Sequence, residues 1–412
     1  MNSRERVLSA LSHRQPDRVP VCLSGHRSSG IAAIAYPKLR AFLGLPARPV
    51  RVYDPVQQLA IVDADVLDRF GVDTIEMGRG FSLTAGDWRD WVLPDGTPCK
   101  IPAYIHPVKM GNDWHVYTAD GTLIAIQRAG CLYFEQTCFP LLDSEAQSFP
   151  DLATPLNKVD WWALGSPPAP IGYDDEGLKK LAIGAKALRQ SSDRAIIGLF
   201  GGNLLEIGQF LFRADEFFLL LAADPPRADA FLDALVEIHL ANLEQFLRSV
   251  GPYIDVIVFG DDLGMQTGPQ ISPAMYRRYF KERHAKLWRR AKELAKVKVM
   301  LHCCGGVRQL LPDLIDAGLD AINPVQIAAN GMDLRSLRRE FGSRITFWGG
   351  GCDTQFVLPE ADPEQVARHV ADQLRAGGTG GGFVFQQVHN IMANVPPANV
   401  IAMLDSVRDF RG

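Results

Sequence analysis

The residues in this chain most able to do chemistry are His302, Cys304 and Cys352. His302 and Cys304 follow the apolar run 297–301, which is typical of a buried strand, and alternate side chains of a strand share a face. Cys352 follows a second apolar run, 344–348, and three glycines. One imidazole and two thiolates suit zinc, and three protein ligands leave one coordination position open for a substrate. The pattern therefore predicts a catalytic metal centre.

The alternative interpretation is that His302 is a buried core histidine and that the cysteines only pack. Cys352, at the end of a neighbouring predicted strand, adds a second thiol to His302 and Cys304 and so favours zinc. Hard cations are less suitable, because they prefer oxygen ligands. Zinc that carries two thiolates is a weak Lewis acid, better suited to holding a thiolate or phenolate leaving group than to making hydroxide from water. This favours alkyl transfer over hydrolysis, although Cys₂His sites also occur in dehydrogenases and deaminases.

Length and composition are those of a folded protein with a large core. The chain has 412 residues, 47% of them hydrophobic and 22% charged, with a net charge of −4. This balance gives no reason to expect nucleic acid or a membrane as partner. The N-terminus predicts an amphipathic helix without an apolar signal core, and the run 217–223 is too short to span a bilayer. We expect a cytoplasmic protein, in which seven scattered cysteines are not a disulfide framework.

Eight short apolar segments alternate with helical patterns along the chain. The predicted strands are 19–23, 72–76, 195–199, 255–259, 297–301, 321–325, 344–348 and 383–385. Helices are predicted between the later strands, at 204–221, 275–295, 307–317 and 363–376. This order predicts the α/β class and a (β/α)₈ TIM barrel that spans residues 1–412 as a single domain. A doubly wound open sheet is the alternative, and no Gly-x-Gly-x-x-Gly follows a first strand to support it.

Residues 80–170 depart from this alternation. Turn signals at 94–96 and 119–121 separate alternating runs, which predicts an antiparallel β-rich insertion after strand 2 of the barrel. Its aromatic residues either line a substrate pocket or form a small core of the insertion itself: Trp88, Trp91, Trp114, Tyr133 and Phe134.

Polar residues cluster where the predicted strands end, which is where barrel enzymes build their active sites. Asp261 and Asp262 are candidates for acid/base catalysis, for supporting a metal-bound histidine or for anchoring the substrate, and the alternative is that an aspartate caps the next turn. His389 is predicted to donate to an oxygen of the substrate, while Glu206 is interpreted as a helix-start residue. The candidate substrate-binding residues are His26, Asn203, Gln326 and Asn390.

Two further stretches are interpreted as structural. The glycine-rich segment 377–382 is similar to a phosphate loop, but it precedes strand 8 and so is expected at the opposite end of the barrel from the active site. The basic stretch 277–298 is interpreted as a helix with one buried and one solvated face.

With these residues in place, the chain resembles the uroporphyrinogen decarboxylase superfamily, whose fold is a (β/α)₈ barrel. The segments 4–21 and 389–400 resemble the beginning and the end of its members. True decarboxylases need no metal, and they carry an arginine-rich N-terminal loop and an aspartate at the end of strand 2. Here the loop 25–30 has one arginine, and strand 2 ends in Glu76-Met77-Gly78.

The other branch of the superfamily, the zinc-dependent corrinoid methyltransferases, uses His-x-Cys and a distant Cys as zinc ligands. That pattern matches His302, Cys304 and Cys352. The resemblance implies transfer of a methyl group from a small donor to the Co(I) corrinoid of a partner protein, since no cobalamin-binding domain is evident in this sequence. The segment 30–45 resembles the aromatic O-demethylase members, so the expected donor is a methoxylated aromatic.

Several alternatives remain open from the sequence. One is a metal-free decarboxylase of a porphyrinogen-like tetrapyrrole acid, another is a thiol-methylating corrinoid methyltransferase, and a third is a non-enzymatic zinc-holding or corrinoid-partner protein. Related thiol-alkylating zinc barrels have a glutamate ligand where this chain has Gln326, which leaves the fourth zinc position unassigned. A homodimer is the default oligomer.

Overall fold

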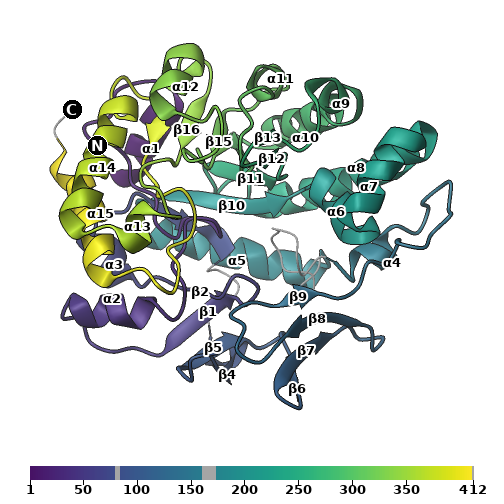
Figure 1. The fold of residues 1–412 in the computed structure, drawn as a ribbon, viewed down its shortest axis with the longest axis horizontal. Helices are drawn as coiled ribbons and strands as arrows, with labels where there is room; N and C mark the ends of the chain where they lie inside the picture. The colour runs from purple at the N-terminus through teal and green to yellow at the C-terminus, as the bar shows by residue number, and fades with distance from the viewer. Residues whose placement is uncertain (79–83, 160–172, 411–412) are drawn as a thin grey trace.

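The centre of the computed structural model, which describes residues 1–78, 84–159 and 173–410, is a parallel β-sheet (Figure 1). Its order is β17-β16-β15-β14-β11-β10-β3, so neighbouring strands follow one another along the chain. The strands are β3 (Thr74–Glu76), β10 (Ala195–Gly201), β11 (Val256–Gly260), β14 (Lys298–His302), β15 (Ala321–Asn323), β16 (Thr346–Trp348) and β17 (Phe383–Val384).

The backbone around Val21 fills the eighth position and joins the two edges of this sheet. The N–H of Cys22 donates to the carbonyl of Phe385 (2.8 Å), and the N–H of Asp73 donates to the carbonyl of Val21 (2.8 Å). The predicted (β/α)₈ barrel is therefore confirmed. The predicted strand 19–23 is reduced to a single bridge at Val21, because Pro20 has no N–H to donate and the chain turns just after this point.

Alternation along the strands separates the interior of the barrel from the layer that faces the helices. Every second residue of β10, from Ala195 to Leu199, and of β11, Val256 and Val258, belongs to one buried apolar cluster. The residues between them belong to a larger cluster shared with the helices. Each fully buried Val, Leu or Ile in these clusters contributes roughly 1.5–3 kcal/mol relative to an exposed one. Helix α1 (Ser3–Leu11) adds three residues to the inner cluster and contacts β3, β10 and β17.

At the carboxyl ends of the strands the inner rows become polar. On β14, on β15 and just after β17, the inner row reaches His302, Asn323 and Gln386, each two positions after a residue of the inner apolar cluster. All three side chains are buried. Strand alternation therefore places a polar layer directly above the apolar filling of the barrel.

Helices surround the sheet, as Figure 1 shows. Those at the N-terminal side and before β10 are α2 (Tyr36–Phe42), α3 (Ala64–Arg69), α4 (Ala153–Leu156) and α5 (Asp175–Ser191). Those after β10 are α6 (Leu205–Phe212), α7 (Ala214–Ala223), α8 (Pro225–Val250), α9 (Pro273–Tyr279), α10 (Lys281–Leu294), α11 (Leu311–Asp316), α12 (Leu334–Phe341), α13 (Val357–Glu360), α14 (Pro363–Gly377) and α15 (Pro397–Asp409).

Two predicted helices prove to be broken. The helix predicted at 204–221 is divided at Arg213, whose φ of 71° lies outside the helical region. The helix predicted at 275–295 is divided at Phe280, where a fully buried ring anchors the junction of α9 and α10. Within the described ranges, we find no helix both long and apolar enough to cross a membrane.

Between β3 and β10 the chain forms antiparallel strands, in the lower part of Figure 1. They are β4 (Trp88–Val92), β5 (Pro98–Pro102), β6 (Val108–Met110), β7 (Asp113–Tyr117), β8 (Leu123–Gln127) and β9 (Glu135–Gln136). Two earlier strands, β1 (Val50–Asp54) and β2 (Leu59–Ala60), join β4 and β5 in one sheet, which the sequence pattern did not indicate. The small hairpin of β12 (Gly264–Met265) and β13 (Gly268–Pro269) follows β11.

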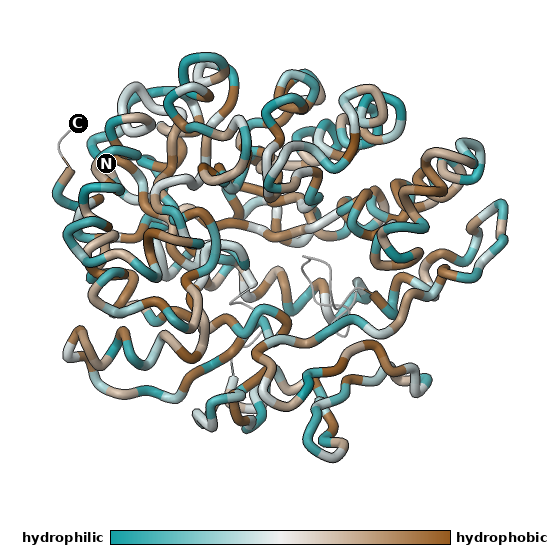
Figure 2. Tube along the Cα trace, viewed as in Figure 1, coloured by the Kyte–Doolittle hydropathy of each residue, from teal (hydrophilic) through white to brown (hydrophobic). Residues whose placement is uncertain are grey.

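The aromatic residues of this antiparallel region pack against one another. The rings of Trp91 and Trp114 meet edge to face with centroids 5.9 Å apart, and Phe134 stacks on Trp91 at 6.3 Å. Figure 2 shows apolar segments along these strands as well as along the central barrel. These contacts favour the interpretation that the three aromatic residues form a local core.

Candidate metal centre

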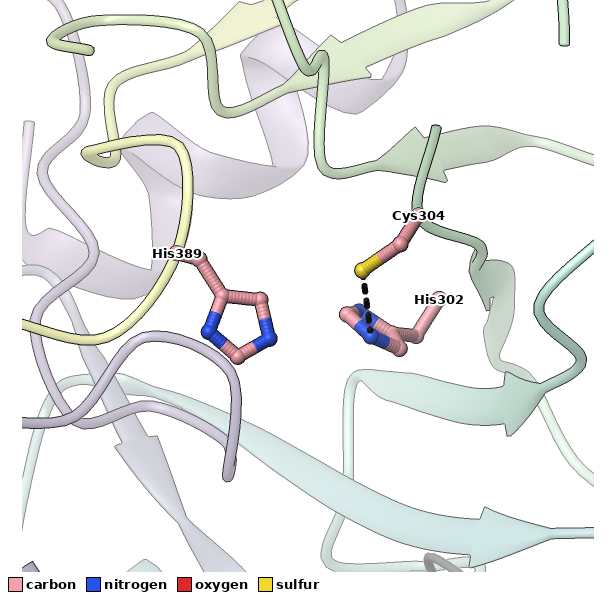
Figure 3. A group of neighbouring side chains, drawn as sticks. All are labelled: His302, Cys304 and His389. Atoms are coloured by element: carbon pink, nitrogen blue, oxygen red, sulfur yellow. Dashed lines mark hydrogen bonds between the residues drawn. The ribbon is translucent and has the colours of Figure 1, made fainter. Parts of the chain in front are cut away.

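His302, Cys304 and His389 converge at the carboxyl end of the barrel (Figure 3). His302 ends β14, Cys304 follows two residues later, and His389 approaches from the segment after β17. One ligand atom from each residue lies within 4.8 Å of the other two, and His302 Nε2 is 3.5 Å from Cys304 Sγ. Nitrogen and sulfur donors that meet in this way fit a zinc ion.

The ring of His302 is held in one orientation by Asn323. Its Nδ1 lies 2.9 Å from Asn323 Oδ1, while Asn323 Nδ2 donates to the carbonyl of Trp348 (3.0 Å) and to Gln386 Oε1 (3.2 Å). Because Asn323 Oδ1 can only accept, His302 Nδ1 carries the proton and Nε2 presents its lone pair to the centre. This is how proteins orient a metal-binding histidine.

The N-terminal loop is tied to the same centre. His26 Nε2 donates to Gln386 Oε1 (3.0 Å), and Gln386 Nε2 donates to the carbonyl of Ser28 (3.1 Å). The hydroxyl of Ser28 lies 3.2 Å from His302 Nε2 and can donate to it. His26 and Ser28 are both buried, so the loop forms one wall of the centre.

Two histidines beside His302 are neutral, because burial lowers the pKa of each. Burial, and then the proximity of His302, lowers the pKa of His389 to about 3. Burial, followed by the same neighbour, also lowers the pKa of His26 to about 3. A neutral imidazole can bind a metal through one nitrogen or donate a hydrogen bond through the other.

Cys304 and Cys303 lie in different surroundings. The backbone N–H of Cys304 donates to Asp262 Oδ1 (2.7 Å), and burial, followed by the charge of Asp262, raises the pKa of the Cys304 thiol well above its usual range. A bound cation has the opposite effect and deprotonates a coordinating thiol. Cys303 is fully buried and accepts from the N–H of Leu263 (3.2 Å), which engages its sulfur in the packing of the next loop.

In the described part of the chain, Cys352 stands outside the three-residue group. Its thiol is fully buried among apolar side chains and donates to the carbonyl of Asp353 at 3.6 Å. Its backbone pairs in parallel with Gln387, two residues before His389. The predicted role of Cys352 as a zinc ligand stays a prediction.

Asp261 caps the start of α6. Its two carboxylate oxygens accept from the N–H groups of Leu205 (3.0 Å) and Glu206 (3.0 Å), and Oδ2 lies 3.3 Å from His284 Nε2. The side chain is fully buried. Asp261 therefore caps a helix that precedes it in the chain, where the sequence had suggested the next turn, and this contact gives it a positioning role beside the centre.

Asp262 and Glu206 lie on the side of the centre that Cys304 faces. Asp262 Oδ1 is 3.9 Å from His302 Nε2, and its side chain is 34% exposed, so a ligand can reach it. Glu206 Oε2 accepts from the N–H of Asp262 (3.0 Å) and from Asn203 Nδ2 (2.6 Å). Burial, followed by Asp262 and Asp261, raises the pKa of Glu206 well above its usual range. Interpreting Glu206 only as a helix-start residue missed these contacts.

The other predicted substrate-binding residues hold loops together around the centre. Gln326 Oε1 accepts from the N–H of Gly305 (2.7 Å), the residue after Cys304. Asn390 Oδ1 accepts from the N–H of Gly30 (2.7 Å), and its Nδ2 donates to Gln57 Oε1 (2.7 Å). These bonds fix the walls of the centre.

The two stretches interpreted as structural have structural contacts. Three carbonyl oxygens of the glycine-rich segment 377–382 accept from Arg338, whereas a phosphate loop presents N–H groups to its ligand. The basic stretch 277–298 forms ion pairs with acidic residues of α8, such as Arg278 with Asp229 (2.5 Å).

The sequence interpretation did not single out Ser28, Asn323 or Gln386. A signal for two of them was present, since Asn323 and Gln386 continue the inner rows of their strands with the period of two that selected His302. Ser28 lies on a loop, where no periodicity indicates which side chains face the centre.

Comparisons with known proteins agree with this fold. Residues 145–410, more than half of the chain, match the family model Uroporphyrinogen decarboxylase (URO-D). The Uroporphyrinogen decarboxylase of Proteus mirabilis (strain HI4320) is 23% identical over 264 residues, which cover 63% of this chain and 70% of that protein. The protein of the same description from Coxiella burnetii (strain RSA 493 / Nine Mile phase I) is 25% identical over 195 residues, which cover 46% of this chain and 50% of the relative.

Among solved structures, a methyltransferase from Methanosarcina mazei is similar in fold. It superposes with a TM-score of 0.60 over 100% of this chain and 99% of its own, at 16% sequence identity. A likeness at this identity shows the fold alone. The family is shown by the match over residues 145–410, and the chain belongs to the uroporphyrinogen decarboxylase (URO-D) family.

Proposed function

We propose that this protein is a zinc-dependent methyltransferase that moves a methyl group from a methoxylated aromatic donor to the Co(I) corrinoid of a partner protein. The observation that carries the proposal is the meeting of His302, Cys304 and His389 at the barrel mouth, with the lone pair of His302 Nε2 directed into the group. Zinc takes its ligands from histidine nitrogen and cysteine sulfur, and catalytic zinc keeps one position open for a substrate. The description of the similar Methanosarcina mazei protein as a methyltransferase supports the reaction class.

In this proposal the zinc ligands are His302, Cys304 and Cys352, and His389 faces the fourth position. Thiolates are stronger ligands for zinc than a second imidazole at the same site, and the Cys352 backbone already lies beside the segment that carries His389. Zinc, when bound, supplies the positive charge that makes an ether oxygen a better leaving group.

The remaining residues act on the donor. His389 is neutral and can donate an N–H to the ether oxygen. Asp262 is a carboxylate exposed to the barrel mouth, and it can relay a proton from solvent to this oxygen after the methyl group has left. Asp261 positions the start of α6 and the acids beside it. His26, Asn203, Gln326 and Asn390 would shape the donor pocket. The bond between the methyl carbon and oxygen breaks, a bond from that carbon to cobalt forms, and the phenolate becomes a phenol.

Decarboxylation of a porphyrinogen-like acid is the second candidate, because the curated relatives bear that name. The structure offers an observation against it. The one arginine of the N-terminal loop, Arg27, has its guanidinium 3.6 Å from Asp54, so it is already engaged by a carboxylate of the protein. A substrate with several carboxylates needs cations that are not committed in this way.

The test combines metal analysis with the visible spectrum of Co(I) cobalamin. The purified chain is expected to hold about one zinc and to form methyl-Co(III) with methoxylated aromatics, in a panel that also contains methanol, methylamines and methyl thioethers. Methyl loss from methylcobalamin to a thiol would instead support the thiol-methylating alternative. Absence of zinc, together with porphyrinogen decarboxylation that survives Cys352→Ser, would overturn the proposal in favour of the second candidate.

A further inference from the structure

Arg27 lies between two residues that build the metal centre. Its neighbours in the chain are His26, whose ring centroid is 6.4 Å from that of His302, and Ser28, whose hydroxyl is 3.2 Å from His302 Nε2. The Arg27 side chain is only 15% exposed. A guanidinium at this place is the natural candidate for binding a carboxylate on an aromatic donor. Whether its charge is already compensated by the protein therefore decides which donors the site accepts.

The charge of Arg27 is already compensated by the protein. Its Nε is 3.6 Å from Asp54 Oδ2, on a carboxylate that is 2% exposed. Burial lowers the pKa of Arg27, but the charges of Asp54 and then Glu76 outweigh burial and raise it. Glu76 is buried at the end of β3, at the same end of the barrel as the centre. One cation thus faces two carboxylates.

On the opposite side of the centre, the described residues add a carboxylate. Asp262 is partly exposed there, and the buried carboxylate of Asp261 lies behind it. Two thiolate ligands would offset the two charges of zinc. A donor at this site therefore meets a surface with more negative than positive charge.

The wall next to Arg27 is aromatic. Tyr53, the residue before Asp54, and Tyr104, just after β5, both lie within electrostatic reach of the guanidinium. Burial raises the pKa of Tyr104 to about 12, which keeps its phenol neutral. Phenol rings beside a compensated ion pair suit an uncharged aromatic ring better than an anionic one.

From these charges we infer that the donor site selects aryl methyl ethers without a carboxylate and discriminates against methoxybenzoates. This inference rests on the proposed function and names the substrate class within it. The physical reason is that a donor carboxylate would be desolvated next to Asp54, Glu76 and Asp262. Among the described residues, the cation beside them is Arg27, whose charge the protein already compensates.

The test uses the zinc-loaded full chain, Co(I) cobalamin and pairs of donors that differ only in one carboxylate. Guaiacol is compared with vanillate, and veratrole with veratrate. We expect kcat/KM to be at least about tenfold higher for the neutral member of each pair, with a smaller ratio at high salt, because screening weakens the repulsion. Equal or better use of the carboxylates would overturn the inference.

A binding measurement separates this inference from the proposed function. Calorimetric titration with catechol and with protocatechuate, the demethylated products, requires no methyl transfer. Tighter binding of catechol supports the inference even if no donor is demethylated, in which case only the proposed function fails. Tighter binding of protocatechuate overturns the inference even if methyl transfer is observed.

The variant Glu76→Gln removes one of the two charges that compensate Arg27. The preference for neutral donors should then shrink by at least about threefold, because the guanidinium gains a net positive charge to offer. The matched control is Asp229→Asn on α8, which removes the same charge from a carboxylate that pairs with Arg278 and Arg283 and should leave the ratio of the two donors unchanged. An unchanged ratio in a folded Glu76→Gln variant contradicts the role of this cluster.

Discussion

Cys304 and Cys352 have the same position in the sequence pattern and different surroundings in the structure. Both follow an apolar strand and both are bordered by glycine. The sulfur of Cys304 is 3.5 Å from His302 Nε2, and its backbone N–H is held by Asp262. The sulfur of Cys352 is buried among apolar side chains and directed to the carbonyl of Asp353. The end of a strand therefore determines the backbone position of a cysteine, whereas the local backbone conformation determines the direction of its thiol.

The glycines explain the difference between these two strand ends. His302 is still part of β14, so counting by two from the strand gives the direction of His302 and indicates that of Cys304. Before Cys352, Gly349 and Gly350 have φ values of 104° and 78°, which no strand residue adopts. The period of two is lost there, and the face of Cys352 cannot be obtained by counting from β16.

The largest expected effect separates Cys304 from its neighbour. Cys304→Ser should lower zinc affinity by at least about 100-fold, since even supporting residues around metal ligands change affinity by 10–100-fold, and methyl transfer should be lost with it. Zinc binding is measured by competition with a chromogenic chelator. Cys303→Ser is the matched control. The Cys303 sulfur accepts from the N–H of Leu263, so this variant should bind zinc as tightly as the parent. Equal losses in the two variants would contradict the assignment of Cys304.

The second prediction decides between Cys352 and His389 as the third ligand. With zinc on His302, Cys304 and Cys352, the variant Cys352→Ser should lose zinc by about 100-fold or more, whereas His389→Gln should keep zinc and lose methyl transfer. Cobalt(II) substitution reports the number of thiolates through its charge-transfer absorption. The reverse pattern, with zinc lost only in His389→Gln, would show that the ligands are the three residues already grouped in the structure.

A smaller effect is expected at Asn323, which orients the ring of His302. Asn323→Leu should lower zinc affinity about 10–100-fold, because His302 Nδ1 loses its acceptor and the ring its fixed orientation. Asn323→Asp keeps an acceptor and should restore affinity.

Asn399→Leu is the control for a merely structural loss at Asn323. Asn399 is also buried and donates to two carbonyls, those of Leu358 and Ala361, but it lies away from the metal centre on α15. It should lose stability without losing zinc. If Asn399→Leu and Asn323→Leu lose zinc to the same extent, Asn323 has no specific role.

The sequence was sufficient for the barrel because buried parallel strands leave a strong local signal. Runs such as 195–199 and 256–259 are apolar on both faces, and each is followed by a helical pattern. The signal fails where tertiary contacts override it. Helix breaks at Arg213 and Phe280 depend on local backbone geometry and on packing, and the joining of β1 to β5 depends on a long-range pairing without a local pattern.

The candidate centre was partly predictable for a related reason. His302 and Cys304 could be chosen by type, spacing and position at a strand end. His389 could be chosen by its place after the last strand, but its proximity to Cys304 depends on the path of a loop. The capping role of Asp261 and the contacts of Glu206 depend on how α6 meets β11, and no pattern in a single sequence reports that meeting.

The glycines before Cys352 offer a prediction about stability. Gly350 has φ +78°, and a Cβ there would lie 2.9 Å from the Cβ of Val325. Gly350→Ala should therefore reduce the free energy of unfolding by about 1–3 kcal/mol through strain and contact together. Gly380→Ala is the control, since its φ of +79° is the same but no atom lies within 4 Å. Gly380→Ala should lower the free energy of unfolding by about 1 kcal/mol from backbone strain alone. If urea titrations give the same decrease for both variants, the contact with Val325 adds nothing to the effect at Gly350.

The smallest effect concerns the pH dependence of stability on the His389 side of the centre. The pKa of His389 is about 3 in the folded protein against 6.5 for an ordinary histidine. Between these values the unfolded chain binds a proton that the folded chain does not, so this contribution to stability is complete above pH 6.5 and is lost as the pH falls toward 3. In the metal-free protein His389→Gln should remove about 1 kcal/mol of the loss seen between pH 7.5 and 5.5. Parallel unfolding profiles for the variant and the parent would mean that His389 is as easily protonated in the folded chain as in the unfolded one. A histidine in that state would not stand as a neutral donor beside His302, and it could not serve as the hydrogen-bond donor that faces the fourth zinc position.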